Sequence, residues 1–273
     1  EFYMPELPEV ETIKNELSPH VMRRKITGVK LLSEIIVRSP DGQEFTSRIL
    51  GQRITGLDRR GKYLFFCLAG GEYLVMHLRM AGSLLLQRDS EEPPKYTRAV
   101  ISLDNGENIF FRDPRHFGRM WLVKDTGEIT DRLGPEPLSA AFTPAVLTDL
   151  LQKRNAPIKA VLLEQNIIAG IGNMYADEIL HDAGIHPLRP AASLTGQEIE
   201  KMYRAIRKIL SAALEGKGAS VRDYFRPGGE VGAAQFQFKV AHGLGGKKCP
   251  CGGEIRRIVV RNRGTYFCPE CQK

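Results

Sequence analysis

Four of the five cysteines lie close together at the C-terminal end, and this cluster limits what that end can fold into. Cys249 and Cys251 form one pair, Cys268 and Cys271 form a second, and sixteen residues separate the pairs. Four thiolates in two close pairs suit tetrahedral Zn²⁺, and the β-prone residues between them predict a zinc ribbon or β-hairpin finger. Because so short a segment has no hydrophobic core, the metal would supply its folding free energy.

Two disulfides are the alternative for the same four residues. Structural disulfides are typical of secreted proteins, and the first residues lack the basic region and long apolar run of a signal peptide. A single residue separates Cys249 from Cys251, where two are usual, which tightens the first knuckle. We therefore predict one structural Zn²⁺. A shell closed by four thiolates leaves no open position for a zinc-dependent hydrolase.

An excess of basic residues indicates a polyanionic partner. The chain has 39 Lys and Arg against 32 Asp and Glu, a formal net charge of +7, and a sequence pI near 9.2. Neutralised phosphates release condensed counterions, which favours such a chain on nucleic acid. The predicted finger is also basic, although a solvated charged face would look the same: Lys247, Lys248, Arg256, Arg257, Arg261 and Arg263. No apolar run approaches the roughly 18 residues of a membrane span.

The N-terminal segment predicts one helix. In residues 7–17, apolar side chains recur at helical spacing, and Pro8 suits a first turn. Ser18-Pro19 is expected to end this helix, because a proline disfavours the helical conformation of the residue before it.

Short runs rich in Ile, Val, Leu, Phe and Tyr follow from about residue 26 to 124. Gly70-Gly71 and Asp104-Asn105-Gly106 separate some of them and are typical of hairpin turns. The clearest expected strands are Tyr63–Leu68, Tyr73–Leu78, Arg98–Leu103 and Asn108–Arg112. An antiparallel sandwich or barrel behind the N-terminal helix is the simplest interpretation.

A helical region is expected after the linker-like residues 133–137. Thr195 and Glu198 form a capping-box pattern, and the helix they begin should close at Glu215–Gly218. Its apolar face comprises Ile199, Met202, Tyr203, Ile206, Ile209, Leu210 and Ala213. Residues 226–248 are rich in Gly and lack periodicity, which predicts a mobile loop.

Short motifs occur ahead of the cysteine cluster in one fixed order. They are Met4-Pro-Glu-Leu-Pro-Glu-Val-Glu11, Arg59-Arg-Gly-Lys-Tyr63, His77-Leu-Arg-Met-Ala-Gly82, Asp113-Pro-Arg-His-Phe-Gly118, Leu133-Gly-Pro-Glu-Pro-Leu138 and Gly170-Ile-Gly-Asn-Met-Tyr-Ala-Asp-Glu178. In these motifs the chain closely resembles the formamidopyrimidine-DNA glycosylases, a bacterial family of helix–two-turn–helix DNA repair enzymes. The resemblance covers nearly the whole chain from Met4.

The resemblance implies an α+β multidomain chain. Residues 1–4 would be an N-terminal extension or cloning remnant, and residues 5–132 a catalytic β-sandwich domain. Residues 133–225 would form a helix–two-turn–helix domain, 226–248 a lesion-recognition loop and connector, and 249–273 the zinc finger.

The resemblance also implies a bifunctional glycosylase and abasic-site lyase of base-excision repair. The family attacks deoxyribose C1′ with an N-terminal proline amine, here Pro5, and its Schiff base permits β,δ-elimination. A terminal amine has a pKa of about 8 and is partly neutral near pH 7. Glu6 matches the family's general acid/base, and Lys62 matches a lysine that contacts the lesion-side phosphate or base. A helix-start carboxylate and a basic hairpin tip are the alternatives for these two.

Three further residues match those that fill the gap left by a flipped nucleotide. Met80 and Phe117 would replace the base stacking that is lost, and Arg115 would donate hydrogen bonds to the cytosine left without its partner. Glu9, one turn from the nucleophile, would help to position the site against DNA. For Met80 and Phe117 the alternative is a core position, and for Arg115 it is a surface position.

The C-terminal half would complete the DNA interface. Gly170–Asn173 precedes a helix expected near Met174, so its amides and the Asn173 side chain suit a phosphate. Lys159 and Arg263 match phosphate-binding residues of the helical module and the finger. Tyr224–Gly232 occupies the place of a loop that closes on 8-oxoguanine, whereas Val240-Ala-His-Gly243 departs from the family's Val-Tyr-Gly pattern. The six histidines, including His77, show no ligand spacing and are expected to be structural or DNA-facing.

The implied partner is duplex DNA with an oxidised purine, such as 8-oxoguanine or a formamidopyrimidine, opposite cytosine. No membrane or obligate protein partner is expected, and a cytoplasmic location at the bacterial nucleoid follows from the substrate. Two alternatives stay open: an endonuclease VIII-like glycosylase for oxidised pyrimidines, and a non-catalytic damaged-DNA-binding protein. The residues that match around Glu6 and Met80 favour the purine branch.

The residues before Pro5 generate the first prediction. With Glu1–Met4 attached, the Pro5 nitrogen is an amide and forms no Schiff base, so they would be a mis-assigned start, a cloning remnant or a segment trimmed in the cell. We favour a start at Met4, which falls where the family's initiator lies. We predict that the chain beginning at Pro5 nicks an 8-oxoguanine duplex in a gel assay and that the extended chain does not. Equal turnover by both would rule out Pro5 as the nucleophile.

Overall fold

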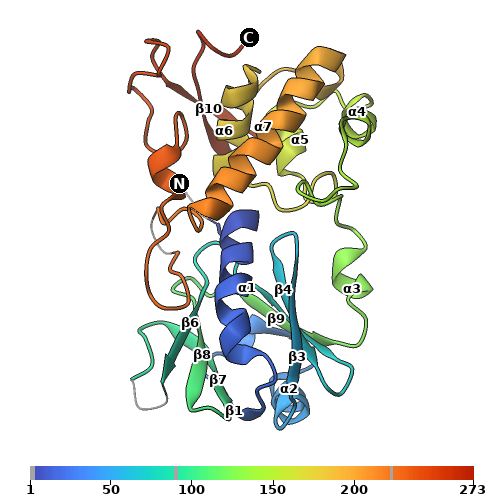
Figure 1. Cartoon of the computed structure of the whole chain (residues 1–273), viewed down its shortest axis with the longest axis vertical. Helices are drawn as coiled ribbons and strands as arrows, with labels where there is room; N and C mark the ends of the chain where they lie inside the picture. Colours follow the sequence, from blue (N-terminus) through green and yellow to red (C-terminus); the bar gives the residue numbers. More distant parts are fainter. Residues whose placement is uncertain (1–3, 89–91, 222–223) are drawn as a thin grey trace. The chain divides into compact units, whose positions relative to one another are not determined.

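The structure, a computed structural model, describes residues 4–88, 92–221 and 224–273. Residues 1–3 of the predicted extension and residues 222 and 223 of the predicted helical domain lie outside the described residues. The described residues form two compact units: 4–131 with 216–233, and 132–215 with 234–273 (Figure 1). The predicted α+β class is confirmed, with helices and two sheets in the first unit and helices with a β-hairpin in the second.

The first unit begins with α1 (Leu7–Val21), which confirms the predicted helix. The predicted end at Ser18-Pro19 is wrong, because α1 continues to Val21 with Pro19 inside its last turn. Only the donor of Pro19 itself is lost there. Val21 is fully buried, so packing against the core holds this last turn in place.

Two sheets form the sandwich of this unit. One has the order β1 (Ile26–Leu31), β7 (Thr97–Leu103), β8 (Glu107–Arg112) and β6 (Ser83–Arg88). The other has the order β2 (Val37–Ser39), β9 (Arg119–Val123), β5 (Tyr73–His77), β4 (Tyr63–Leu68) and β3 (Ile54–Arg60). Neighbouring strands are antiparallel except for β2 and β9, which are parallel. The four strands expected from the sequence are all present.

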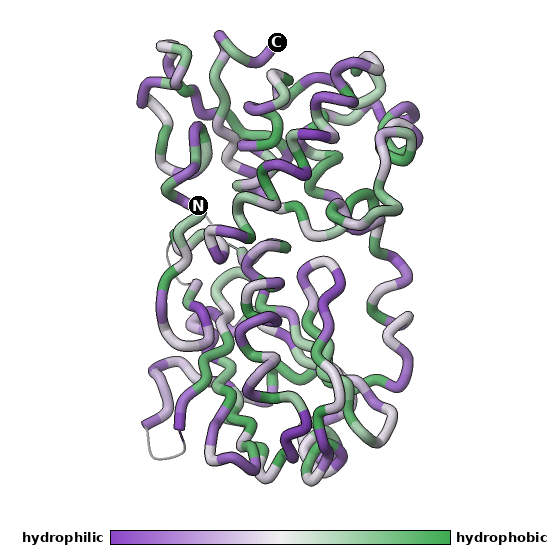
Figure 2. Tube along the Cα trace, in the orientation of Figure 1, coloured by the Kyte–Doolittle hydropathy of each residue, from purple (hydrophilic) through white to green (hydrophobic). Residues whose placement is uncertain are grey.

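Hydrophobic residues follow the strands of the sandwich, and hydrophilic residues mark turns such as the tip of the β3–β4 hairpin (Figure 2). Gly71 and Gly106 have φ of 79° and 78° in the predicted hairpin turns. These left-handed conformations suit glycine, which has no Cβ.

The sequence did not predict the short helix α2 (Gly42–Ile49). The Asp41 side chain caps it by accepting hydrogen bonds from the backbone N–H groups of Gln43 and Glu44. Phe45 and Ile49, four residues apart, are its buried residues. Two buried positions are too few to show a period in the sequence. The short segments η1 (Glu34–Ile36) and α3 (Gly127–Thr130) complete this unit.

The second unit contains four helices, namely α4 (Pro144–Leu151), α5 (Ile158–Leu163), α6 (Asn173–Ala183) and α7 (Gly196–Glu215), among the residues that the structure describes. The predicted capping box is present, since the Thr195 N–H donates to Glu198 and the Glu198 N–H donates to the Thr195 hydroxyl. The finger strands β10 (Arg256–Val260) and β11 (Arg263–Phe267) pair as a hairpin. Two short turns, η2 (Ala191–Ser193) and η3 (Ala234–Gln237), also belong here.

Residues 216–233 leave the helical unit and pack on the first one. The Arg226 guanidinium pairs with Glu16 of α1, with Nε 2.9 Å from Oε1. The Leu86 N–H donates to the Pro227 carbonyl at 2.8 Å. The Ala233 N–H donates to the Gly216 carbonyl, which joins the two ends of the segment. None of the helices in the described ranges is both long and apolar enough to cross a bilayer.

Candidate functional site

The register of the five-stranded sheet gathers the predicted site residues of the first unit at one end. Tyr63 at the start of β4 pairs with His77 at the end of β5, and His77 pairs with Arg119 at the start of β9. The turns next to these three positions must therefore lie together. They carry Lys62, Met80, Arg115 and Phe117.

An ion pair joins this end of the sheet to the N-terminal half of α1. The Arg59 Nε of β3 donates to the Glu11 carboxylate at 2.6 Å, and Lys14 donates to the same carboxylate at 2.6 Å. Burial raises the pKa of Glu11, but hydrogen bonds and charges from Lys14 and Arg59 outweigh it and hold the pKa below its ordinary value. Glu11 is therefore ionised at neutral pH.

The start of α1 carries the predicted catalytic residues, and it is buried. Pro5 is buried, Glu6 is 2% exposed and Glu9 is fully buried. The Glu9 carboxylate accepts the Glu6 N–H at 2.8 Å and the Ala219 N–H at 2.7 Å. A buried carboxylate needs such donors, because an uncompensated charge in the interior is costly. Glu9 thereby fixes the residue after Pro5 and joins it to the segment 216–233.

The approach of this segment to Glu9 requires a glycine. Gly218 has φ of 77°, and a Cβ there would lie 2.9 Å from the Cγ of Glu9. A side chain at this position would push the Ala219 N–H away from the carboxylate. Tyr224, which is 1% exposed, lies with its hydroxyl 3.4 Å from the Glu9 carbonyl. Burial first, and the charges of Glu9 and Glu16 next, raise the pKa of Tyr224 well above its ordinary value, so it stays neutral.

The turn that presents Arg115 and Phe117 is built around a buried aspartate. The fully buried Asp113 carboxylate accepts the Arg115 N–H at 3.0 Å and the Gly118 N–H at 2.7 Å. A Cβ at Gly118 would lie 2.5 Å from the ring of Phe111. The Arg115 guanidinium lies 5.1 Å from the centroid of the Phe117 ring, which is 41% exposed. The sequence reasoning gave Asp113 no role, although Asp-Pro is a turn signal.

For His77 the sequence predicted only a structural or DNA-facing position, and the structure adds its contacts. Its Nδ1 accepts the Arg79 N–H at 2.9 Å, and its ring packs edge-on against Tyr63 with centroids 4.5 Å apart. Burial, followed by the charges of Arg79 and Lys62, places the pKa of His77 well below its ordinary value. The ring is therefore neutral at pH 7 and carries its proton on Nε2.

The second unit places the other predicted residues around one carbonyl. Asn173, the first residue of α6, donates from Nδ2 to the Gly264 carbonyl at 2.9 Å. Arg263, exposed at the start of β11, directly precedes that glycine. Lys159 is fully buried and donates to the same carbonyl at 3.1 Å, so its ammonium faces the protein interior rather than a phosphate in solvent.

Gln165 shapes the turn before α6. Its side-chain oxygen accepts the Gly170 N–H at 2.9 Å, and its side-chain nitrogen donates to the Ile171 carbonyl at 2.8 Å. Gly172 is the N-cap of α6, and glycine has no side chain that could cap the helix. The first amides of an α-helix carry a partial positive charge, so this end of α6 suits an anion.

The side chains of the four predicted cysteine ligands lie close together. Their sulfur atoms all lie within 4.8 Å of one another, with Cys249 and Cys271 3.7 Å apart and Cys251 and Cys268 3.6 Å apart. Thiolates bound tetrahedrally to zinc at 2.3 Å lie about 3.8 Å apart, whereas a disulfide requires about 2.05 Å. The short knuckle at Cys249 therefore still permits the tetrahedral set. His181 of α6 lies 3.2 Å from the Cys249 sulfur, where its ring can donate to the thiolate.

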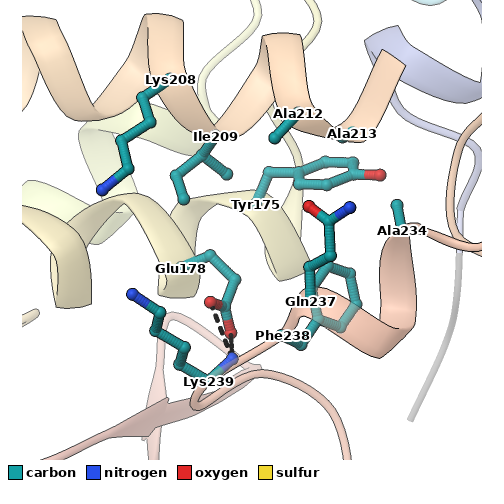
Figure 3. A pocket seen from close by; sticks show the side chains of 10 residues that line it. All are labelled: Tyr175, Glu178, Lys208, Ile209, Ala212, Ala213, Ala234, Gln237, Phe238 and Lys239. Atoms are coloured by element: carbon teal, nitrogen blue, oxygen red, sulfur yellow. Dashed lines mark hydrogen bonds between the residues drawn. The ribbon is translucent and has the colours of Figure 1, made fainter. Parts of the chain in front are cut away.

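A further carboxylate anchors the segment that leads into the finger. Glu178, which is 2% exposed, accepts the N–H groups of Lys239, Val240 and Ala241 at 2.7 to 3.0 Å. Figure 3 shows Glu178 below Tyr175, with its carboxylate turned to the backbone of Lys239. Because the N–H groups that bind Glu178 here belong to the backbone, this anchor does not depend on the side chains that differ from the family's Val-Tyr-Gly pattern.

Comparisons with known proteins agree along the whole chain. Residues 4–120 match the formamidopyrimidine-DNA glycosylase N-terminal domain, residues 133–224 match its H2TH domain, and residues 246–273 match a zinc finger found in FPG and IleRS. The predicted zinc site is thereby confirmed. The formamidopyrimidine-DNA glycosylase of Chloroflexus aurantiacus is 45% identical over 98% of both chains, and that of Pelotomaculum thermopropionicum is 43% identical over 99% of both.

Solved structures show the same similarity. The MutM (FPG) protein of Thermus thermophilus is 43% identical and superposes with a TM-score of 0.89 over 98% of both chains. The Lactococcus lactis Fpg in complex with DNA that contains an abasic site is 34% identical, with a TM-score of 0.91 over 98% of this chain and 99% of that one.

The buried aspartate of the 113–118 turn gives one prediction. We expect Asp113→Asn to lower the free energy of unfolding by about 1–3 kcal/mol. One of the two N–H groups that Asp113 binds would then face the NH2 group of asparagine instead of a carboxylate oxygen. It should also lower kcat/KM for lesion excision, since Arg115 and Phe117 lose their fixed turn. Asp125→Asn is the control, because Asp125 accepts a backbone N–H in an exposed turn. A loss no larger than that of the control would contradict the assignment.

The zinc centre gives another prediction. We expect Cys268→Ser to lose the bound zinc and weaken the affinity for lesion-containing duplex by at least about tenfold, because the metal supplies the folding free energy of the finger. Metal analysis and fluorescence anisotropy on the same sample measure both. Cys67→Ser, outside the cluster, should keep one zinc and wild-type affinity. Full affinity in a zinc-free protein would show that the finger folds without metal.

Proposed function

The chain belongs to the formamidopyrimidine-DNA glycosylase family of base-excision repair enzymes, and we propose that it removes oxidised purines opposite cytosine from duplex DNA. The observation that carries the proposal is the gathering of Lys62, Met80, Arg115 and Phe117 at one end of a sheet. The Arg59–Glu11 ion pair joins this end to α1, which carries Pro5 and Glu6.

Pro5 is the nucleophile, on the condition that it is the first residue of the mature protein. The lone pair of its nitrogen forms a bond to C1′, and the bond from C1′ to the base breaks with its electron pair. The nitrogen then loses its proton, and Glu6 protonates O4′ as the sugar ring opens to an iminium ion. Loss of a C2′ proton expels the 3′ phosphate, and a second elimination expels the 5′ phosphate. No metal takes part in these steps.

Met80, Arg115 and Phe117 take the place of the flipped nucleotide. An exposed Phe117 and a half-buried Met80 offer apolar surface to the neighbouring bases. Arg115 donates to the acceptor edge of the orphaned cytosine. Its guanidinium lies beside the Phe117 ring, and Asp113 fixes the turn that holds both.

Each unit carries side chains or amides that can donate to DNA phosphates. Lys62 and the Nε2–H of neutral His77 serve this role in the first unit. Asn173, the amides at the start of α6 and Arg263 serve it in the second. Residues 224–232 cover the extruded base, and Glu9 and Glu16 anchor the segment 216–233 at Ala219 and Arg226. The enzyme works where its substrate is, in the cytoplasm at the nucleoid.

A series of opposite bases tests this proposal. We expect Arg115→Ala to lower kcat/KM on an 8-oxoguanine·cytosine duplex by about 5- to 150-fold, the worth of a good contact to a base edge. The preference for cytosine over adenine opposite the lesion should shrink with it. Lys124→Ala removes a charge at the other end of β9 and should change neither value. An unaltered preference in Arg115→Ala, or faster excision of oxidised pyrimidines by the wild type, would overturn the proposal.

A further inference from the structure

A fully buried ion pair lies inside the second unit. Lys159 of α5 and Asp177 of α6 are 0% and 1% exposed, with Nζ 2.7 Å from Oδ1. The Lys159 ammonium also donates to the Thr265 hydroxyl at 2.8 Å and to the Gly264 carbonyl at 3.1 Å. Each of the three N–H groups of the ammonium therefore has an acceptor. Two of these acceptors, on Gly264 and Thr265, belong to β11 of the finger.

The aspartate binds the same strand. Its second carboxylate oxygen accepts the Tyr266 N–H at 3.0 Å. Residues 264, 265 and 266 of β11 are thus held directly by the ion pair, and Thr265 is fully buried where it is held. The pair therefore connects helices α5 and α6 to strand β11 of the finger.

Two predicted phosphate contacts depend on this connection. Asn173 donates to the same Gly264 carbonyl as Lys159, at 2.9 Å. Arg263 is the residue before that glycine and projects from the exposed start of β11. The position of the Gly264 carbonyl therefore sets the spacing between the Asn173 side-chain amide on α6 and the Arg263 guanidinium on β11.

The pair is poorly suited to a purely stabilising role. Burial raises the pKa of Asp177 to about 7, even with Lys159 and the Tyr266 N–H beside it. Desolvation of two charges commonly offsets their attraction, and apolar residues of similar size often replace such a pair without loss of stability. What apolar residues cannot supply is directional bonds to Gly264, Thr265 and Tyr266.

We propose that Lys159 and Asp177 are positioning residues for DNA binding, which hold Arg263 and Asn173 at the spacing of the phosphates they contact. The inference rests on the proposed function in one respect, namely that Arg263 and Asn173 touch phosphates. Lys159 itself contacts no DNA in this role. It acts through the Gly264 carbonyl and the Thr265 hydroxyl.

Salt-dependent binding of the zinc-loaded full chain tests the inference, with a duplex that carries a tetrahydrofuran abasic analogue as the probe. The double variant Lys159→Met/Asp177→Leu keeps the side-chain volume and removes the charges. We expect its Kd at low salt to rise about tenfold, the effect of losing a charge-assisted hydrogen bond. The slope of log Kd against log salt should fall by about 0.9, the share of one phosphate contact. Its Tm and zinc content should stay close to those of the wild type.

Three further variants separate the explanations. Arg263→Ala should show the same loss of slope, because it removes the contact itself. Thr265→Val keeps the ion pair but removes one bond to β11, so it should shift Kd in the same direction by less, and it serves if the double variant fails to fold. Glu200→Gln breaks an exposed ion pair on α7 and should change nothing. The single-turnover excision rate at saturating DNA separates the binding effect from the chemistry.

The outcomes are distinct. Wild-type Kd and slope in the folded double variant and in Thr265→Val, with a reduced slope in Arg263→Ala, would overturn the positioning role and leave the proposed function standing. An unchanged slope in Arg263→Ala would refute the phosphate contact of the proposed function and the inference with it. A lower Tm with unchanged slope in the double variant would show that the pair only stabilises the fold.

Discussion

The carboxylate of Glu9 is the constraint on which the first unit depends. It is fully buried, and it is compensated by backbone N–H groups from Glu6 and Ala219, which are far apart in the sequence. Removing either donor would leave the Glu9 carboxylate incompletely compensated in the interior, which is energetically costly. The start of α1 and the segment 216–233 are therefore fixed together. The proposed nucleophile and acid stand at one side of this carboxylate, and the proposed lesion loop stands at the other.

Buried acids play the same part elsewhere in the molecule. Asp113 accepts two N–H groups of the turn that presents Arg115, Asp177 accepts one from β11, and Glu178 accepts three from the segment before the finger. The amides bound by Asp113 and Glu178 belong to irregular segments, whereas the amide bound by Asp177 belongs to strand β11. Loops that must meet DNA are thereby held in shape before it arrives. Preorganisation of this kind reduces the ordering cost of binding.

The sequence predicted the parts of the structure that follow from local patterns. Short apolar runs bounded by turn residues predicted β4, β5, β7 and β8, a capping box predicted α7, and cysteine spacing predicted the zinc ligands. The continuation of α1 past Pro19 was missed because it depends on packing of the last turn. The roles of Asp113 and Asp177, and the burial of Lys159, were missed for a related reason. Their partners are backbone groups and buried neighbours that only the folded chain brings together, as with the Lys159–Gly264 bond.

Borohydride reduction during turnover tests the central claim most directly, because it converts an iminium ion into a stable bond between protein and DNA. The protein should be verified by mass to begin at Pro5, reacted with an 8-oxoguanine·cytosine duplex and digested, and the cross-linked peptide then sequenced. We expect one adduct, on the nitrogen of Pro5. An adduct on Lys62, or no adduct from a chain that begins at Pro5 and binds the duplex tightly, would contradict it.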